Sequence, residues 1–172
     1  MNVAPIDTQQ QQRVRATTLE YLQRAEGLYG LAHRPIPVGF DLLGRALGVY
    51  CVNRRQAVIR YNPYIFSLYF EHGLRTTVPH EVAHYITDRL FGLANVRPHG
   101  KEWRSVMQAL GAEPRARTHL DLTGIPLRRQ RRFTYRCDCA VHQLSSCRHN
   151  RIVNGTARYH CRDCGSQLVV AP

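Results

Sequence analysis

The chain has 172 residues, of which 44% are hydrophobic, and its formal net charge is +12. This length can build one sizeable hydrophobic core and one small additional module. Nowhere do eighteen apolar residues occur together, and the N-terminus lacks a long apolar run with a cleavage signature. We therefore expect a cytoplasmic protein without membrane contact, and we expect it to be a monomer.

The first predicted element is a helix. Residues 1–12 are polar and rich in glutamine, and we expect them to be disordered. From Arg13 to about Leu31 apolar residues recur at helical spacing, and Gly30 and Pro35 end the pattern. This helix carries no residue that indicates catalysis.

Short strands are predicted next. Apolar runs at 38–43, 46–52 and 57–61 indicate a small antiparallel meander, with Asn53-Arg54-Arg55 at one turn. Cys51, in the second run, is expected to be an inert core thiol. Asn62 followed by Pro63 is a cap and first-turn pair, which predicts the start of a short helix.

The strongest motif is His80-Glu81-Val82-Ala83-His84. On a helix, His80 and His84 lie four residues apart on one face, close enough for both imidazoles to bind one cation. Glu81 follows the first histidine, so its carboxylate can lean toward the open side of that cation. This arrangement is typical of zinc hydrolases, although two packed or solvated histidines would give the same pattern.

The residues around the motif predict a helix with one buried side. Apolar residues recur at four-residue spacing beside the histidines: Val78, Val82, Ile86 and Leu90. Thr76 or Thr77 can cap the start, and Pro79 then falls in the first turn. Gly92 provides a stop. Asp88 is placed either to accept an N–H from a ligand imidazole or to face solvent.

A third ligand is needed, because catalytic zinc usually takes three protein ligands and keeps one position for water. A helix from about Pro98 to Gly111 would bury an inward face formed by Trp103, Val106, Met107 and Leu110. His99 lies four residues before Trp103, hence on that same face. His99 is the expected ligand, and Glu102 is the alternative.

Positive charge is concentrated toward the C-terminus. From residue 112 onward there are eleven arginines and four acidic residues. This surplus favours binding to the phosphate backbone of nucleic acid, and we expect DNA as a partner. The arginines expected at that contact are Arg128, Arg129, Arg131, Arg132, Arg148 and Arg151. Residues 112–132 are interpreted as a connector, so the first four could also belong to a solvated linker.

Six cysteines occur, five of them within residues 137–164, and this crowding favours metal binding over disulfides. The preferred ligand set is Cys137, Cys139, Cys161 and Cys164. The last two form a C-x-x-C knuckle whose curl Gly165 permits. The C-x-C half is unusually tight, and His142 or Cys147 could replace Cys139. Four protein ligands leave no place for water, so this second zinc is expected to be structural.

Taken together, these motifs resemble the bacterial SprT family and, more distantly, the protease domain of eukaryotic Spartan. The resemblance covers about residues 76–170, with Cys147 outside the family pattern. The blocks that carry it are His80-Glu81-Val82-Ala83-His84, Pro98-His99-Gly100-Lys101-Glu102-Trp103, Arg117-Thr118-His119, Cys137-Asp138-Cys139, His142-Gln143-Leu144, Arg148-His149-Asn150 and Cys161 to Cys164.

The resemblance implies an α+β fold, with a zincin-like metalloprotease domain over residues 13–125 and a zinc ribbon over residues 133–170. It implies one catalytic zinc held by His80, His84 and His99, with Glu81 as catalytic base, and one structural zinc in the ribbon. By similarity to Spartan, proteins covalently trapped on DNA are the expected substrates.

Two further expectations concern catalysis. An extended substrate would add to the edge of a sheet beside the active-site helix, but the sequence does not indicate which strand. An oxyanion-stabilising tyrosine or arginine is expected, and Tyr85 and Arg104 are nearest in sequence. Two other functional classes fit the same motifs: a non-catalytic zinc-ribbon protein that binds nucleic acid, and an adaptor in which both metals are structural.

Overall fold

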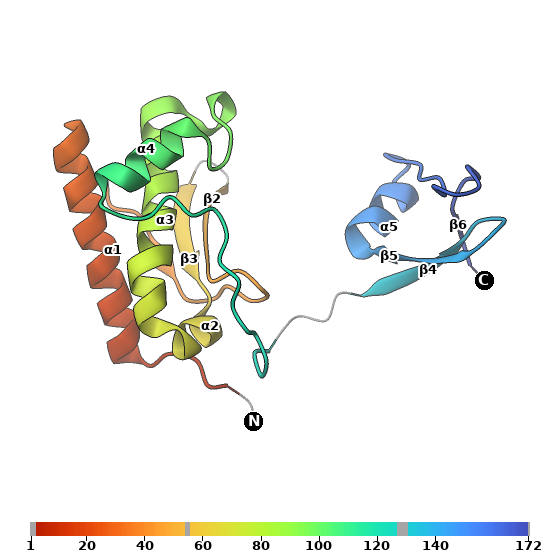
Figure 1. The fold of residues 1–172 in the computed structure, drawn as a ribbon, viewed down its shortest axis with the longest axis horizontal. Helices are drawn as coiled ribbons and strands as arrows, with labels where there is room; N and C mark the ends of the chain where they lie inside the picture. The colour runs from red at the N-terminus through yellow and green to blue at the C-terminus, as the bar shows by residue number, and fades with distance from the viewer. Residues whose placement is uncertain (1–2, 54–55, 127–130, 172) are drawn as a thin grey trace. The chain divides into compact units, whose positions relative to one another are not determined.

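The computed structural model describes residues 3–53, 56–126 and 131–171 of the chain. They form two compact units, Met1–Leu127 and Arg128–Pro172. The first unit combines several helices with a three-stranded sheet, and the second combines one described helix with another three-stranded sheet, so the expected α+β class is confirmed (Figure 1).

The first unit begins with helix α1 (Thr8–Tyr29), which Gly30 ends as predicted, with a left-handed φ of 60°. The expectation that residues 1–12 are disordered is wrong for residues 8–12, which are helical. The cause is a reciprocal cap: Asp7 accepts the N–H of Gln10 at 2.8 Å, and the Gln10 side chain accepts the N–H of Asp7 at 3.1 Å. Ile6, just before the cap, is buried and anchors the helix start.

The sheet of this unit has the strand order β1-β3-β2. Its strands are β1 (Val38–Gly39), β2 (Gly48–Asn53) and β3 (Gln56–Tyr61). Strands β2 and β3 are antiparallel, but β1 is parallel to β3, so the predicted meander is wrong in topology. The connection between β1 and β2 places these two strands on opposite sides of β3. As a result β2 lies at an edge of the sheet.

Two details of the predicted strand region also differ. Cys51 is only half-buried and does not belong to the core. Of the predicted turn, Arg54 and Arg55 lie outside the described residues. The predicted helix start at Asn62-Pro63 is confirmed: helix α2 (Pro63–Leu68) begins there, and Asn62 Oδ1 accepts the N–H groups of Tyr64 and Ile65.

Helix α3 (Phe70–Phe91) is the central element of the unit and contacts α1, α2, β2 and β3. It begins well before Thr76, so Pro79 lies inside the helix instead of in its first turn. The buried face of α3 extends toward its N-terminus through Gly73, Leu74 and Val78. This burial offsets the backbone hydrogen bond that is lost at Pro79. The predicted stop at Gly92 is confirmed.

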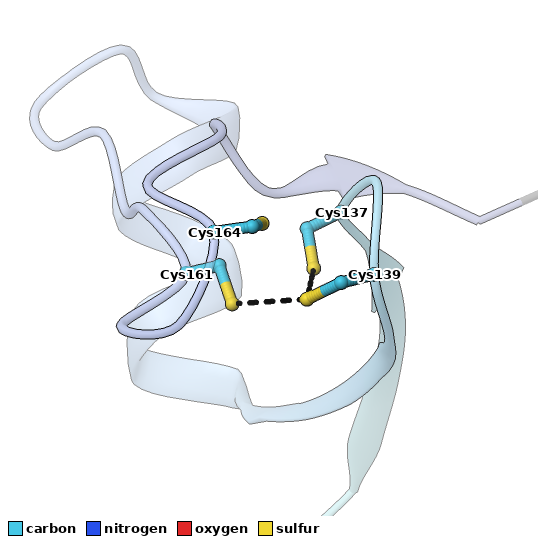
Figure 2. Close-up of side chains that lie close together, drawn as sticks. All are labelled: Cys137, Cys139, Cys161 and Cys164. Atoms are coloured by element: carbon cyan, nitrogen blue, oxygen red, sulfur yellow. Dashed lines mark hydrogen bonds between the residues drawn. The ribbon is translucent and has the colours of Figure 1, made fainter.

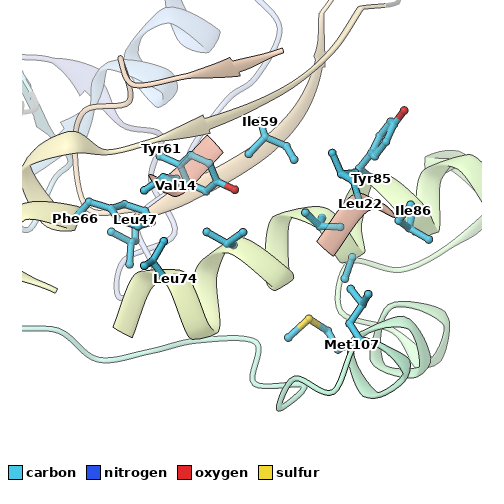
Figure 3. Packing of buried hydrophobic residues seen from close by; sticks show 14 of the residues in the cluster. Val14, Leu22, Leu47, Ile59, Tyr61, Phe66, Leu74, Tyr85, Ile86 and Met107 are labelled. Carbon is cyan, nitrogen blue, oxygen red and sulfur yellow. The ribbon is translucent and has the colours of Figure 1, made fainter. Parts of the chain in front are cut away.

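The core of the first unit lies between α1, α3 and the sheet (Figure 3). Figure 3 labels side chains from all of these elements, among them Val14, Leu22, Ile59, Tyr61, Leu74 and Ile86. Arg89 of α3 donates to the carboxylate of Glu26 of α1 at 3.0 Å, and both side chains are largely buried. This ion pair fixes the two long helices against each other.

After α3 the chain forms a 3₁₀ helix η1 (Leu93–Asn95) and helix α4 (Lys101–Ala109), which packs on α3. Residues 112–126 are not simply a connector, because they pack back onto the first unit. Ile125 is buried, and the Tyr69 hydroxyl donates to the carbonyl of Asp121 at 2.8 Å.

The second unit contains β4 (Arg132–Arg136), β5 (Val141–Ser145), α5 (Ser146–Val153) and β6 (Val169–Val170), with the strand order β5-β4-β6. Among the residues of this unit that the structure describes, the buried hydrophobic cluster has four members: Tyr135, Leu144, Cys161 and Leu168. Among the described helices of both units, none has the length and apolar character needed to cross a membrane.

Candidate metal centres

Three imidazoles converge in the first unit. The Nε2 atoms of His80 and His84 lie 3.1 Å apart, and the Nε2 atom of His99 lies 3.0 Å from that of His80 and 3.1 Å from that of His84. The three rings are inclined to one another by 58° to 64°. These nitrogens form a compact donor set that could hold a metal ion.

The elements that position the three rings differ from those predicted in one respect. His80 and His84 lie on one face of α3, as their spacing predicts. His99 does not belong to the following helix, which begins only at Lys101. It lies in a turn closed by the Gly100 N–H and the Arg97 carbonyl at 2.9 Å, and its φ is 57°.

Trp103 packs against all three imidazoles of the cluster. Its indole ring lies 4.7 Å from the rings of His80 and His99 and 5.5 Å from the ring of His84, centroid to centroid. Its N–H donates to the His80 carbonyl at 3.3 Å, and the side chain is 1% exposed. The packed ring restricts the positions that the three imidazoles can adopt.

The protein environment keeps these imidazoles neutral. Burial lowers the pKa of His80 to about 4 and the pKa of His84 to about 3. The pKa of His99 is lowered by burial and then by the nearby charges of Arg117 and Arg104. Neutral imidazoles offer the nitrogen lone pairs that a metal ion requires.

Glu81 lies beside the cluster and is 5% exposed. Burial raises the pKa of its carboxyl group to about 8, and a hydrogen bond from the Tyr50 N–H acts in the opposite direction. That N–H donates to Glu81 Oε2 at 2.7 Å. Strand β2 therefore fixes the carboxylate through its main chain.

Several neighbouring residues do not have the predicted positions. Asp88 is half-buried and contacts no ligand imidazole: it accepts the Tyr50 hydroxyl and, at 3.0 Å, the N–H of Leu93. The main chain of Arg115, and not Asp88, acts on the His80 ring, where it opposes the lowering of the pKa by burial. Glu102, the alternative ligand, lies outside the histidine cluster.

The two predicted oxyanion partners also have other contacts. The Tyr85 hydroxyl donates to the Arg34 carbonyl at 3.1 Å, and Arg104 Nε donates to the His99 carbonyl at 3.2 Å. Two clefts adjoin the imidazoles, and both are lined in part by Gly48, His80 and Glu81. One of them is also lined by Arg117 and His119, which sequence reasoning did not place at the site.

In the second unit, four thiols meet at the ends of β4 and of the knuckle that precedes β6 (Figure 2): Cys137, Cys139, Cys161 and Cys164. Their sulfur atoms all lie within 4.8 Å of one another. The Sγ atoms of Cys137 and Cys139 are 3.5 Å apart, and those of Cys139 and Cys161 are 3.7 Å apart. The preferred set of four thus forms one donor cluster.

Local contacts support this cluster. Gly165 adopts a φ of 72° and its N–H donates to the Cys161 carbonyl at 3.1 Å, which closes the knuckle. Hydrogen bonds from Ser166 lower the pKa of Cys164, which favours the thiolate form that binds metal ions. His142 Nε2 contacts Cys137 Sγ at 3.1 Å without joining the four, and Cys147 is exposed on α5.

Four of the six arginines expected at nucleic acid are described, and all four are exposed. Arg131 lies over the Phe133 ring at 4.9 Å, and Arg148 lies over the Tyr159 ring at 5.7 Å. Arg132 begins β4 and is not part of a linker. Arg128 and Arg129 lie outside the described residues.

The sequence from residue 11 to residue 127 matches the SprT-like family, and the chain belongs to that family. It is similar to curated proteins named Protein SprT. Those from Escherichia coli O1:K1 / APEC, O139:H28 (strain E24377A / ETEC) and strain SE11 are each 44% identical over 112 residues. The match covers 64% of this chain and 65% of each relative. No solved structure matches this chain.

Proposed function

We propose that this protein is a zincin-like zinc metalloprotease that cleaves proteins bound to DNA, including proteins covalently crosslinked to it. The observation that carries the proposal is the convergence of three neutral imidazoles beside the buried carboxyl group of Glu81. Membership of the SprT-like family is consistent with it.

Both donor sets fit zinc. Tetrahedral zinc with Zn–N bonds of about 2.0–2.1 Å places its ligand nitrogens about 3.4 Å apart, close to the 3.0–3.1 Å between the imidazole nitrogens. Zn–S bonds of about 2.3 Å place sulfurs about 3.8 Å apart, close to the 3.5 Å and 3.7 Å between the thiols. Three protein ligands suit a catalytic site, and four thiolates suit a structural one.

When bound, zinc supplies a Lewis acid that polarises a peptide carbonyl and lowers the pKa of a bound water molecule. His80, His84 and His99 would hold the ion. Glu81 is positioned to take a proton from the attacking water and later to deliver it to the leaving amine. Its burial favours the protonated carboxyl group, and this makes the carboxylate a stronger base than a solvated one.

Strand β2 is the expected site for an extended substrate. It lies at the edge of its sheet, and among the described strands it pairs only with β3. Its edge faces α3 at Glu81, because the Tyr50 N–H that donates to Glu81 points away from β3. A peptide added along this edge would pass the imidazole cluster, with main-chain hydrogen bonds aligning its carbonyl groups.

The DNA part of the proposal depends on the second unit. Arg131, Arg148 and Arg151 are exposed there, two of them over aromatic rings, and guanidinium groups on such a surface bind phosphate. We propose that this unit brings the protease to proteins on DNA.

The test compares wild-type protein with Glu81→Gln on a DNA-binding substrate protein, with and without single-stranded DNA. The amide oxygen of Gln can still accept the Tyr50 N–H, so zinc content should stay unchanged. Cleavage should fall by about 10²-fold or more, the scale of a lost acid–base group. Product formation on gels and zinc content by atomic absorption check both statements.

Glu102→Gln is the matched control, because Glu102 is a nearby carboxylate outside the imidazole cluster. It should retain both zinc and cleavage. Full cleavage by Glu81→Gln would contradict the assigned role of Glu81. Salt-dependent DNA binding by a wild-type protein that cleaves nothing would favour the non-catalytic nucleic-acid-binding alternative.

A further inference from the structure

The larger of the two clefts at the imidazole cluster has a volume of about 660 Å³ and a basic lining. Its basic side chains come from three segments that are distant in sequence: Arg45, His72, Arg115, Arg117 and His119. His80 and Glu81 line the same cleft, so any group that fills it lies next to the proposed reaction centre.

The positive charge of this cleft is not neutralised by its own acidic residues. Glu113 is paired with Arg115 at 2.9 Å. Within the described part of the chain, neither Arg45 nor Arg117 forms an ion pair. Glu81, the other carboxyl group in the lining, is buried and held by the Tyr50 N–H. The cleft therefore offers two guanidinium groups to an incoming anion.

Helix α3 contributes polar side chains to the lining of this cleft. His72, Thr76 and His80 follow one another at four-residue spacing, so they share one face of α3. The Nε2 atom of His72 is buried and has no hydrogen-bond partner among the described residues. This nitrogen lies below the surface of the cleft, so the groups exposed to an incoming anion are the guanidinium groups of Arg45 and Arg117.

The second cleft, of about 340 Å³, has a different lining. Its surface is mostly apolar and includes Leu93, Val96, Pro98 and Trp103, with Arg97 as its one arginine. The two clefts share Gly48, His80 and Glu81. An extended peptide that crosses the imidazoles would therefore meet an apolar pocket on one side and a basic pocket on the other.

We propose that the basic cleft is a substrate subsite that selects a glutamate or aspartate side chain close to the scissile bond, with Arg45 and Arg117 as specificity-determining residues. This inference rests on the proposed protease function. A carboxylate is the favoured occupant because guanidinium groups bind it through paired, charge-assisted hydrogen bonds. The position of the cleft at the reaction centre favours a side chain of the substrate over a nucleic-acid phosphate.

The experiment uses fluorogenic peptides that differ at one position, Glu, Gln or Lys, scanned across both sides of the cleaved bond. Wild-type protein should cleave the best Glu peptide with a kcat/KM about tenfold or more above its Gln counterpart. Arg117→Gln should lose most of this preference, because the KM for the Glu peptide should rise. Arg45→Glu should shift the preference toward the Lys peptide.

Binding is measured separately from cleavage. The full-length Glu81→Gln protein should bind a labelled Glu peptide more tightly than the Gln peptide, by fluorescence anisotropy. The difference should shrink in high salt, because Arg45 and Arg117 are exposed. Arg75→Gln is the matched control, an exposed arginine of α3 outside the cleft, and it should leave the preference unchanged.

Equal cleavage and equal binding of the Glu and Gln peptides would overturn the proposal. A uniform loss of kcat for all peptides in Arg117→Gln would also overturn it, because that residue would then support hydrolysis instead of selection. If Arg45 and Arg117 variants lost affinity for a single-stranded oligonucleotide with peptide preference unchanged, the cleft would be a nucleic-acid site. If wild-type protein cleaved no peptide at all, the protease function itself would fail.

Discussion

His99 is the one described residue other than glycine with a positive φ, 57°. This conformation costs an L-residue roughly 1 kcal/mol or more. The turn closed by Gly100 and Arg97, and the hydrogen bond from Arg104 to the His99 carbonyl, hold it in place. The imidazole thereby reaches the two rings of α3 from a turn, where helical spacing alone would not have placed it.

The predicted third histidine therefore joins the imidazole cluster, but from a local structure that differs from the predicted helix. The pair Pro98 and Gly100 around His99 is typical of a turn and could have indicated it. The same limit applies to Asp88. Its hydrogen bond with Tyr50 joins segments distant in sequence, and spacing along one helix contains no information about it.

Glu81 gives a pH prediction for the metal-free protein. Burial raises the pKa of its carboxyl group from the ordinary 4.5 to about 8 in the folded state. A raised folded pKa means that this group's contribution to stability is present at low pH and is lost as the pH rises to about 8. Glu81→Gln should therefore gain stability relative to wild type between about pH 5 and pH 8.

The measurement is urea unfolding in the presence of EDTA, followed by circular dichroism at several pH values. His80 and His84 have lowered pKa values and act in the opposite direction, with stability lost as the pH falls below about 6.5. Wild type and Glu81→Gln both contain these two histidines. Their effect therefore cancels in the difference between the unfolding free energies of the two proteins. A difference in unfolding free energy that does not change with pH would refute the prediction.

At the scale of elements, helix starts and stops with local signals were predictable. Asn62-Pro63, Gly30 and Gly92 act as expected, because capping depends on residues close in sequence. The start of α3 was not predictable from Pro79, since the burial of Gly73 and Leu74 by tertiary packing outweighs that local signal. The parallel pairing of β1 with β3 likewise depends on where a loop crosses the sheet.

The contact between β2 and α3 yields an element-scale prediction. A Cβ atom at Gly48 would lie 2.7 Å from Thr77 Cγ2 and 2.9 Å from Glu81 Cγ. Gly48→Ala should push β2 away from α3, weaken the hydrogen bond from Tyr50 to Glu81, and destabilise the fold by about 1–3 kcal/mol. Peptide cleavage should fall more than zinc content does. Chemical denaturation, turnover and metal analysis measure the three effects.

Gly27→Ala is the control for this variant. Gly27 lies in α1, and a Cβ atom there would meet no atom within 4 Å. The change should stabilise the protein by about 0.5–1 kcal/mol through helix propensity alone. If Gly48→Ala behaved like Gly27→Ala, the close packing of β2 on α3 would not matter for the carboxylate.

At the scale of the whole molecule, the two units differ in what stabilises them. The first has an extensive apolar core, whereas the second has a buried cluster of four residues, one of which is Cys161. A module of this size rarely folds without a metal or another crosslink. Cys161→Ser should therefore unfold the second unit, with loss of its dispersed amide NMR signals, while the signals of the first unit remain.

Cys147→Ser provides the comparison, because Cys147 is exposed and lies outside the thiol cluster. It should retain the metal and the NMR spectrum of both units. Loss of the fold in both variants would indicate a general need for cysteine in this unit, and retention in both would show that the thiol cluster does not hold it together.

The basic cleft shows what sequence reasoning could not reach. Motif spacing indicates both donor sets, because most of their members lie within one helix or one knuckle. The cleft brings Arg45, His72 and Arg117 together from three separate segments. Arg117 belongs to a block that carries the family resemblance, but only the folded chain places it beside Arg45 and His72.

Trp103 has one more consequence. It is the single tryptophan of the chain, and its ring lies within 4.7–5.5 Å of all three imidazoles. We therefore expect its emission to change when an ion binds the histidines, whereas the thiol cluster belongs to a unit without tryptophan. A titration of the proposed zinc, followed by tryptophan fluorescence, should then report occupancy of the histidine cluster without any label.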